Sequence, residues 1–103
     1  LLTRGANPNL LVSGMNPPLL LAAKRGHNDV VEVLLKHPSI NVDLRHTYRE
    51  ETALFAAAEE GHVNIVNALI KKNADIEASN FLKLTPLAIA VEKGHLEVVK
   101  DLV

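Results

Sequence analysis

The sequence contains no cysteine and no tryptophan, and its aromatic residues are one tyrosine and two phenylalanines among 103 residues. Without cysteine, the chain can form neither a disulfide framework nor a zinc ribbon, and it has no thiol nucleophile. A cysteine-free chain suits a reducing compartment, so we expect an intracellular location, either cytoplasmic or nuclear. Because aromatic side chains are scarce, we expect a thin core built from small aliphatic residues.

A strong net charge and a long apolar run are also missing. Eleven basic and 12 acidic residues give a formal net charge of −1, which supplies no overall field to attract a polyanion. No apolar stretch approaches the roughly 20 residues that a membrane-spanning helix requires. We therefore expect no nucleic-acid partner and no membrane partner. The hydrophobic content of 48% indicates that the chain folds, and its length predicts one domain.

What the sequence does contain is an internal repeat. The dipeptide Gly-His occurs at 26–27, 61–62 and 94–95, at intervals of 35 and 33 residues. A short apolar block precedes each dipeptide and a second one follows it. Periods of this length are typical of solenoids, in which each unit is stabilised by stacking on its neighbours.

Both blocks of each unit are predicted to be helical. In the second block of the first unit, Val30, Val31, Leu34 and Leu35 form one apolar stripe of a 3.6-residue helix. Proline near the start of the first block suits a first helical turn, where a missing N–H has no consequence. The glycine of each Gly-His pair is expected to end the first helix with a positive φ.

At this level of detail the chain resembles the ankyrin repeat. The resemblance rests on Thr85-Pro86-Leu87, Ala90 and the run 94–99, together with the loop sequences 5–9 and 74–76. It implies an all-α repeat solenoid, in which helix–turn–helix units stack and are joined by finger loops that resemble β-hairpins. We assign residues 1–103 to one such domain, with a partial repeat at 1–10, repeats at 11–43 and 44–77, and a repeat at 78–103 that is truncated in its second helix. Because Leu1–Leu2 and Leu102–Val103 fall at the second-helix phase, we expect a segment of a longer array.

The chain departs from the family pattern at the start of each first helix. The Thr-Pro-Leu-His sequence of the family normally supplies a histidine that binds the threonine hydroxyl, but Leu20, Phe55 and Ala88 occupy that position. Pro17 also replaces the threonine in the first unit, and Ala53 replaces the proline in the second. We expect burial of Leu20 and Phe55 to compensate, since a buried large apolar side chain contributes about 1.5–3 kcal/mol.

The candidates for chemistry are weak. His27, His62 and His95 recur one repeat apart, about 10 Å in a stacked solenoid, whereas zinc needs ligands near 2 Å. We expect these histidines to brace the turns between helices through ring hydrogen bonds. Adjacent glutamates such as Glu59 and Glu60 do not face each other on a helix, and no serine lies in a nucleophile elbow. No phosphate-binding glycine motif is present either. We therefore expect no enzyme activity, metal, cofactor or small-molecule substrate.

The resemblance assigns recognition to the finger loops and to the exposed ends of the first helices. The candidate partner-binding residues are Asn16, Lys24, Arg25, Arg45, Tyr48, Arg49, Glu51, Glu59, Glu60, Phe81, Leu82, Leu84, Glu92 and Lys93. Tyr48 and Phe81 are two of the three aromatic residues and fall in fingers, where no core requires them. An alternative is that Phe81 and Leu82 pack against the neighbouring finger, and that the charges are only solvated.

These observations predict a non-catalytic scaffold that recognises another protein through its concave face and finger loops. The alternative is a targeting or regulatory segment of a longer enzyme or of a host-directed effector whose catalytic domain lies outside these residues. A purely structural spacer is a third possibility. Fold alone does not separate them, since function depends on the site.

Overall fold

The computed structural model describes residues 5–103, which form six short helices. The helices are α1 (Pro18–Arg25), α2 (Asn28–Leu35), α3 (Ala53–Glu60), α4 (Val63–Lys71), α5 (Pro86–Lys93) and α6 (Leu96–Leu102). Across this range there is no β-strand, and the nearest approach to one is an isolated antiparallel bridge between Val12 and Asn16. The predicted all-helical class is confirmed. Leu1 and Leu2, on which part of the predicted phase rests, lie outside the described residues.

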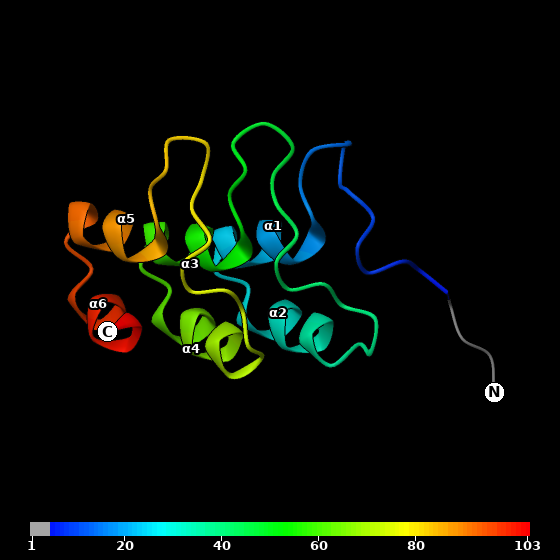
Figure 1. The fold of residues 1–103 in the computed structure, drawn as a ribbon. Helices are drawn as coiled ribbons and strands as arrows, with labels where there is room; N and C mark the ends of the chain where they lie inside the picture. Colours follow the sequence, from blue (N-terminus) through cyan, green and yellow to red (C-terminus); the bar gives the residue numbers. More distant parts are fainter. Residues whose placement is uncertain (1–4) are drawn as a thin grey trace.

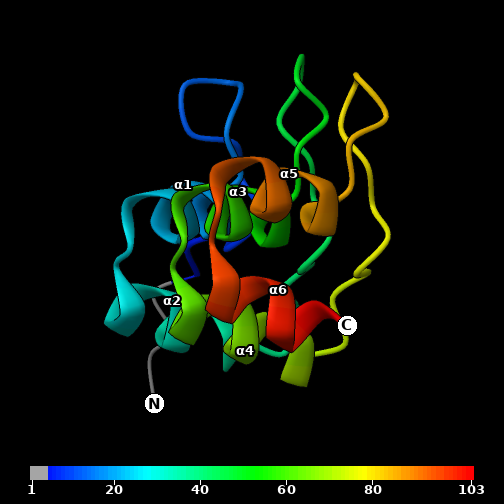
Figure 2. The same ribbon diagram turned by 90° about the vertical axis from the view of Figure 1, so that its left-hand side faces the viewer.

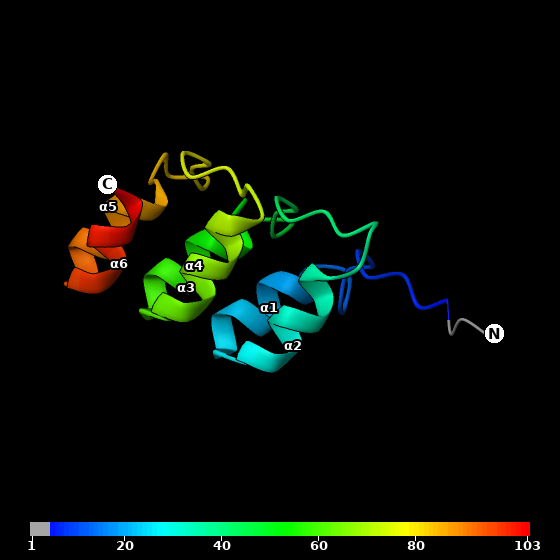
Figure 3. The same cartoon turned by 90° about the horizontal axis from the view of Figure 1, so that it is seen from below.

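The helices form two parallel rows. Figure 1 shows α1, α3 and α5 in one row and α2, α4 and α6 in the other, and Figure 3 shows the three helix pairs following one another along the molecule. α3 packs between α1 and α5, and α4 packs between α2 and α6. Three long loops project from the side of the first-helix row, as Figure 2 shows from the end of the stack. This arrangement is the stacked solenoid that the repeat predicts.

Three fingers are defined by their residues: a first finger (10–16), a second finger (44–51) and a third finger (78–84). In each finger a backbone N–H near the start donates to a carbonyl oxygen at the end, from Val12 N to Asn16 O at 2.6 Å, from His46 N to Glu51 O at 2.8 Å and from Asn80 N to Leu84 O at 2.9 Å. Neighbouring fingers are also joined, since Thr47 N donates to Met15 O and Phe81 N donates to Arg49 O. The fingers therefore form a connected layer beside the helices.

Gly26, Gly61 and Gly94 end the first helices in the left-handed conformation, with φ of 74°, 75° and 75°. The predicted positive φ is confirmed. At Gly61 there is a second reason for glycine, because a Cβ atom built there would lie 2.7 Å from Nδ1 of His95. Conformation and close approach both exclude a side chain at this position.

The recurring histidines act between repeats. Nε2 of His62 lies 3.2 Å from the carbonyl oxygen of Lys24, and Nε2 of His95 lies 2.9 Å from that of Glu59. Each ring therefore reaches the end of the first helix of the preceding repeat. The predicted ring hydrogen bonds are present at His62 and His95, where they join successive repeats, and none is found for His27 among residues 5–103.

The core is thin and aliphatic, as predicted. Ala56, Ala57 and Ala58 are fully buried, so α3 can approach both of its neighbours closely. Leu20 and Phe55, which replace the family histidine, are buried as expected. Thr52 Oγ1 still accepts a hydrogen bond from Phe55 N at 3.2 Å, so α3 keeps its N-cap without the histidine.

Candidate functional site

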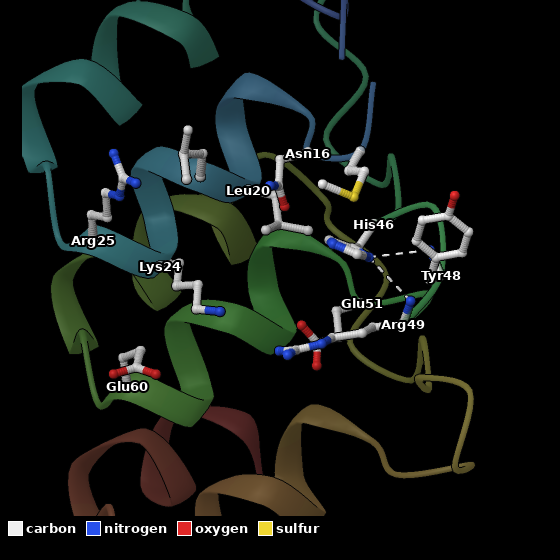
Figure 4. A pocket seen from close by; sticks show the side chains of 11 residues that line it. Asn16, Leu20, Lys24, Arg25, His46, Tyr48, Arg49, Glu51 and Glu60 are labelled. Atoms are coloured by element: carbon white, nitrogen blue, oxygen red, sulfur yellow. Dashed lines mark hydrogen bonds between the residues drawn. The ribbon is translucent and has the colours of Figure 1, made fainter. Parts of the chain in front are cut away.

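The surface between the fingers and the first-helix row forms a groove, the finger groove, with two hollows. The first hollow, of about 660 Å³, lies between the first and second fingers and is shown in Figure 4. The second hollow, of about 370 Å³, lies between the second and third fingers. Arg49 and Glu51 line both hollows, so the second finger forms the wall between them.

The structure brings together every candidate binding residue except Arg45. Those in the first hollow are Asn16, Lys24, Arg25, Tyr48, Arg49, Glu51 and Glu60. The second hollow adds Glu59, Phe81, Leu82, Leu84, Glu92 and Lys93. Residues far apart in the sequence thus share one face because successive repeats place equivalent positions side by side.

Arg45 forms hydrogen bonds with two fingers. Its guanidinium Nη1 donates to the carbonyl oxygen of Glu50 at 2.8 Å and to that of Ser79. These bonds tie the second finger to the start of the third, and Arg45 lines neither hollow. Arg45 therefore holds two fingers together, and its part in partner binding stays a prediction.

Glu51, a predicted finger residue, lines both hollows but is largely buried. Only 5% of the residue is exposed, and it lies on the floor between the two hollows. Burial raises the pKa of the Glu51 carboxyl, and the negative charge of Glu59 raises it further, while Arg49 and Lys24 act in the opposite direction. The position after the finger turn brings Glu51 back against the helices, which sequence position alone does not reveal.

The apolar candidates are exposed. Tyr48 is 71% exposed at the second finger, and Phe81 and Leu82 are 52% and 61% exposed at the third. The ring of Tyr48 lies 6.3 Å from that of His46, tilted by 57°. The alternative that Phe81 and Leu82 are covered by a neighbouring finger therefore does not hold. Exposed apolar side chains that flank a hollow are typical of an interaction surface.

His46 is a groove residue that the sequence analysis did not identify. Its Nδ1 accepts hydrogen bonds from the backbone N–H groups of Tyr48 and Arg49, both at 3.1 Å, which places the ring proton on Nε2 (Figure 4). Burial lowers the pKa of His46, and the positive charges of Arg49 and Lys24 lower it further.

In the third finger, Asn80 has the same role. Its Oδ1 accepts from the backbone N–H groups of Leu82 and Leu84, at 3.0 and 3.1 Å. The signal that could have found both residues is their equal place in successive repeats, since both can present an acceptor to a finger turn.

The base of the fingers carries a ladder of side-chain hydrogen bonds that the sequence analysis also missed. Asn9 Oδ1 accepts from Asn41 N, and Asp43 Oδ1 accepts from Asp75 N, both at 2.9 Å. Each bond joins one repeat to the equivalent loop of the next. This ladder fixes the spacing of the fingers and hence the width of the groove.

The described part of the chain shows no group of three or more histidine, cysteine, aspartate or glutamate residues that could hold a metal ion. A search of the same residues for a helix long and apolar enough to cross a membrane found none. The finger groove is lined by polar, charged and apolar side chains, which can make hydrogen bonds, ionic contacts and apolar contacts.

Comparison with known proteins gives the same picture. The family model "Ankyrin repeats (3 copies)" matches residues 1–80 and 19–103. Alpha-latrocrustotoxin-Lt1a of Latrodectus tredecimguttatus is 40% identical over 91% of this chain, and an ankyrin repeat and KH domain-containing protein of Caenorhabditis briggsae is 35% identical over 100% of this chain. A probable E3 ubiquitin-protein ligase of Oryza sativa subsp. japonica is 34% identical over 84% of the chain.

The chain spans only 6%, 4% and 17% of the lengths of these three relatives. What they share with it is thus the repeat itself. The paired helices, the glycine-terminated first helices, the projecting fingers and the family match agree with one another. The chain belongs to the ankyrin repeat family, whose repeats are protein-interaction modules.

Proposed function

We propose that this chain is a non-catalytic scaffold that recognises another protein through the finger groove. The observation that carries the proposal is the exposure of Tyr48, Phe81 and Leu82 on fingers beside the two hollows. Aromatic side chains of this kind are the usual anchors of protein interfaces, whereas charges at a rim mainly affect association rate. The charges beside them are mixed, with Lys24 and Arg25 on α1 and Glu59 and Glu60 on α3. A mixed surface favours a protein partner over a uniform polyanion.

The groove proposal is tested by a double variant, Tyr48→Ala with Phe81→Ala. A partner is first identified by affinity capture and then reconstituted from purified components. We expect the variant to bind at least about tenfold more weakly, because an anchor contributes about 2 kcal/mol or more when truncated. The helical circular dichroism and the melting temperature should not change, since both side chains are largely exposed.

A matched control removes exposed apolar side chains from the other face. Val33 on α2 and Leu96 on α6 are 69% and 63% exposed, and neither lines a hollow of the groove. Val33→Ala with Leu96→Ala should leave binding unchanged. If the control variant loses binding and the finger variant does not, recognition lies on the outer helix row and the proposal fails.

The second candidate is that this array is the targeting or regulatory segment of a longer enzyme or a host-directed effector. It is favoured by the names of several relatives, among them a ubiquitin ligase, a palmitoyltransferase and a toxin. The groove would then recruit a substrate or a host protein to chemistry performed elsewhere in the parent protein. Sequencing the complete gene distinguishes the two candidates, because a flanking catalytic motif supports the second. Turnover by the purified chain in hydrolase, kinase or nucleotide-binding assays would contradict both.

A further inference from the structure

Glu51 is a buried carboxyl group without a partner. The residue is 5% exposed, yet among residues 5–103 its carboxylate takes part in no hydrogen bond and no ion pair. Its contact with His46 uses only the backbone carbonyl. No side-chain oxygen in the described residues is both buried from solvent and without a hydrogen bond, so the Glu51 carboxylate keeps contact with water in the hollows, while burial of the residue raises its pKa. A carboxylate that lines two hollows and has no protein partner is a candidate for ligand binding.

The second hollow combines this carboxylate with apolar walls. Phe55 and Ile89 are buried at its floor, and Phe81 and Leu82 stand half-exposed at its edge. Glu59 and Glu92 lie at the helical side of the same hollow. The volume of about 370 Å³ is suited to one long side chain with an apolar stem and a cationic tip.

Two cations also line the second hollow, but they do not neutralise the site. Arg49 and Lys93 are exposed, and neither forms an ion pair with a carboxylate in the described part of the chain. The one ion pair found there joins Lys100 to Glu97 on α6. The charges of exposed flexible side chains are screened by salt and water, whereas the charge of buried Glu51 is screened much less. Three carboxylates and two cations line the second hollow, which leaves a formal charge of −1.

We propose that the second hollow receives an arginine side chain of a partner protein, with its guanidinium on the Glu51 carboxylate and its stem against Phe81. The proposal deepens the proposed function and rests on it. Arginine fits better than lysine, because a planar guanidinium donates two parallel hydrogen bonds to a carboxylate and stacks on an aromatic ring. Glu59 and Glu92 also line this hollow, and their negative charges attract the cation to its mouth.

The test uses a defined probe and the whole chain. Nα-acetyl-arginine amide is titrated into ¹⁵N-labelled protein, with the neutral isostere Nα-acetyl-citrulline amide as the matched ligand. We expect arginine to shift the backbone signals of Glu51, Phe81, Leu82 and Ile89 saturably, and citrulline to leave them in place. Glu51→Gln should weaken arginine binding by about tenfold, as expected for loss of a charge-assisted hydrogen bond.

Glu77→Gln is the matched control, because Glu77 is exposed and lines neither hollow. It should bind arginine like the unmodified chain. Equal binding of arginine and citrulline, unchanged binding by Glu51→Gln, or no saturable shift at these four residues would each overturn the proposal. The outcomes for the arginine site and for the proposed scaffold function remain distinguishable. If the chain does not bind the arginine probe but the Tyr48→Ala, Phe81→Ala variant still loses its partner, only the arginine proposal is overturned.

Discussion

The two ends of each repeat follow different rules. At the turn end, where the first helix passes into the second, Gly26, Gly61 and Gly94 have φ values within 1° of one another, and the following histidines have φ of −83°, −83° and −85°. At the finger end, different residues supply the acceptor for the turn, His46 in the second finger and Asn80 in the third, and the closing backbone bond spans five residues in one finger and four in the other. The turn end is constrained by packing, whereas the finger end tolerates exchange and can therefore carry specificity.

The largest loss of stability is expected from a substitution at the turn between the two helices of a repeat. Gly61→Val should destabilise the chain by about 3 kcal/mol, because a β-branched residue is strained at positive φ and its Cβ would displace the His95 ring. Urea denaturation measures the change. Gly94→Val is the matched control: its φ is the same, but a Cβ there meets nothing within 4 Å. We expect a loss of about 1–2 kcal/mol from the backbone strain at Gly94. Equal losses at the two positions would contradict the close approach of the histidine ring.

The next effect concerns Glu51 at the finger end. Glu51→Gln should raise the free energy of unfolding at pH 7 by about 1 kcal/mol, because it removes a charge that burial of the residue disfavours. The pKa of Glu51 is raised in the folded protein, so its penalty is present above the folded pKa and disappears as the pH falls towards 4.5. The stability difference between variant and wild type should therefore shrink on acidification. A difference that stays constant with pH would show that Glu51 is not ionised at neutral pH.

A smaller effect is expected when the turn acceptor of the second finger, His46, is replaced by the asparagine found in the third. His46 has a pKa lowered below its ordinary value of 6.5, so its contribution to stability is present above pH 6.5 and is lost as the pH falls through the folded pKa. Protonation of Nδ1 removes the acceptor for Tyr48 N and Arg49 N. His46→Asn should keep the stability at pH 7 and abolish this part of the acid sensitivity. His46→Ala should lose about 1 kcal/mol at pH 7, since both finger donors lose their acceptor.

The smallest effect tests strain in the third finger. Lys83 has a φ of 67°, in the left-handed region that favours glycine. Lys83→Gly should stabilise the chain by about 0.5 kcal/mol, measured by thermal unfolding, because relief of the strain exceeds the added entropy of the unfolded chain. Lys83→Ala keeps the strain and should leave the melting temperature unchanged. If both variants behave alike, the finger backbone is not strained at this residue.

The sequence predicted the helices well because their signals are local and repeated three times. The Gly-His pairs, the apolar stripes and the prolines at helix starts each predicted an element that the structure contains. The candidate site was predicted less completely. Tyr48, Phe81 and Leu82 are exposed in the fingers as expected. The bonds of Arg45 to two fingers and the burial of Glu51 could not be predicted, because a finger that folds back can bury one residue and expose its neighbour.

The repeat period, the helix–turn–helix unit and the family were therefore determined by the sequence itself, since helix caps and apolar periodicity depend on residues within one turn of each other. Other features depend on contacts between residues more than 30 positions apart in the sequence. They are the two hollows, the buried Glu51 between them, the bond from Arg45 to Ser79 and the ring hydrogen bonds of His62 and His95. Such contacts exist only once successive repeats have stacked, because stacking sets how far each finger and each ring reaches into the next unit. The tertiary structure alone decided which of the candidate residues share one groove.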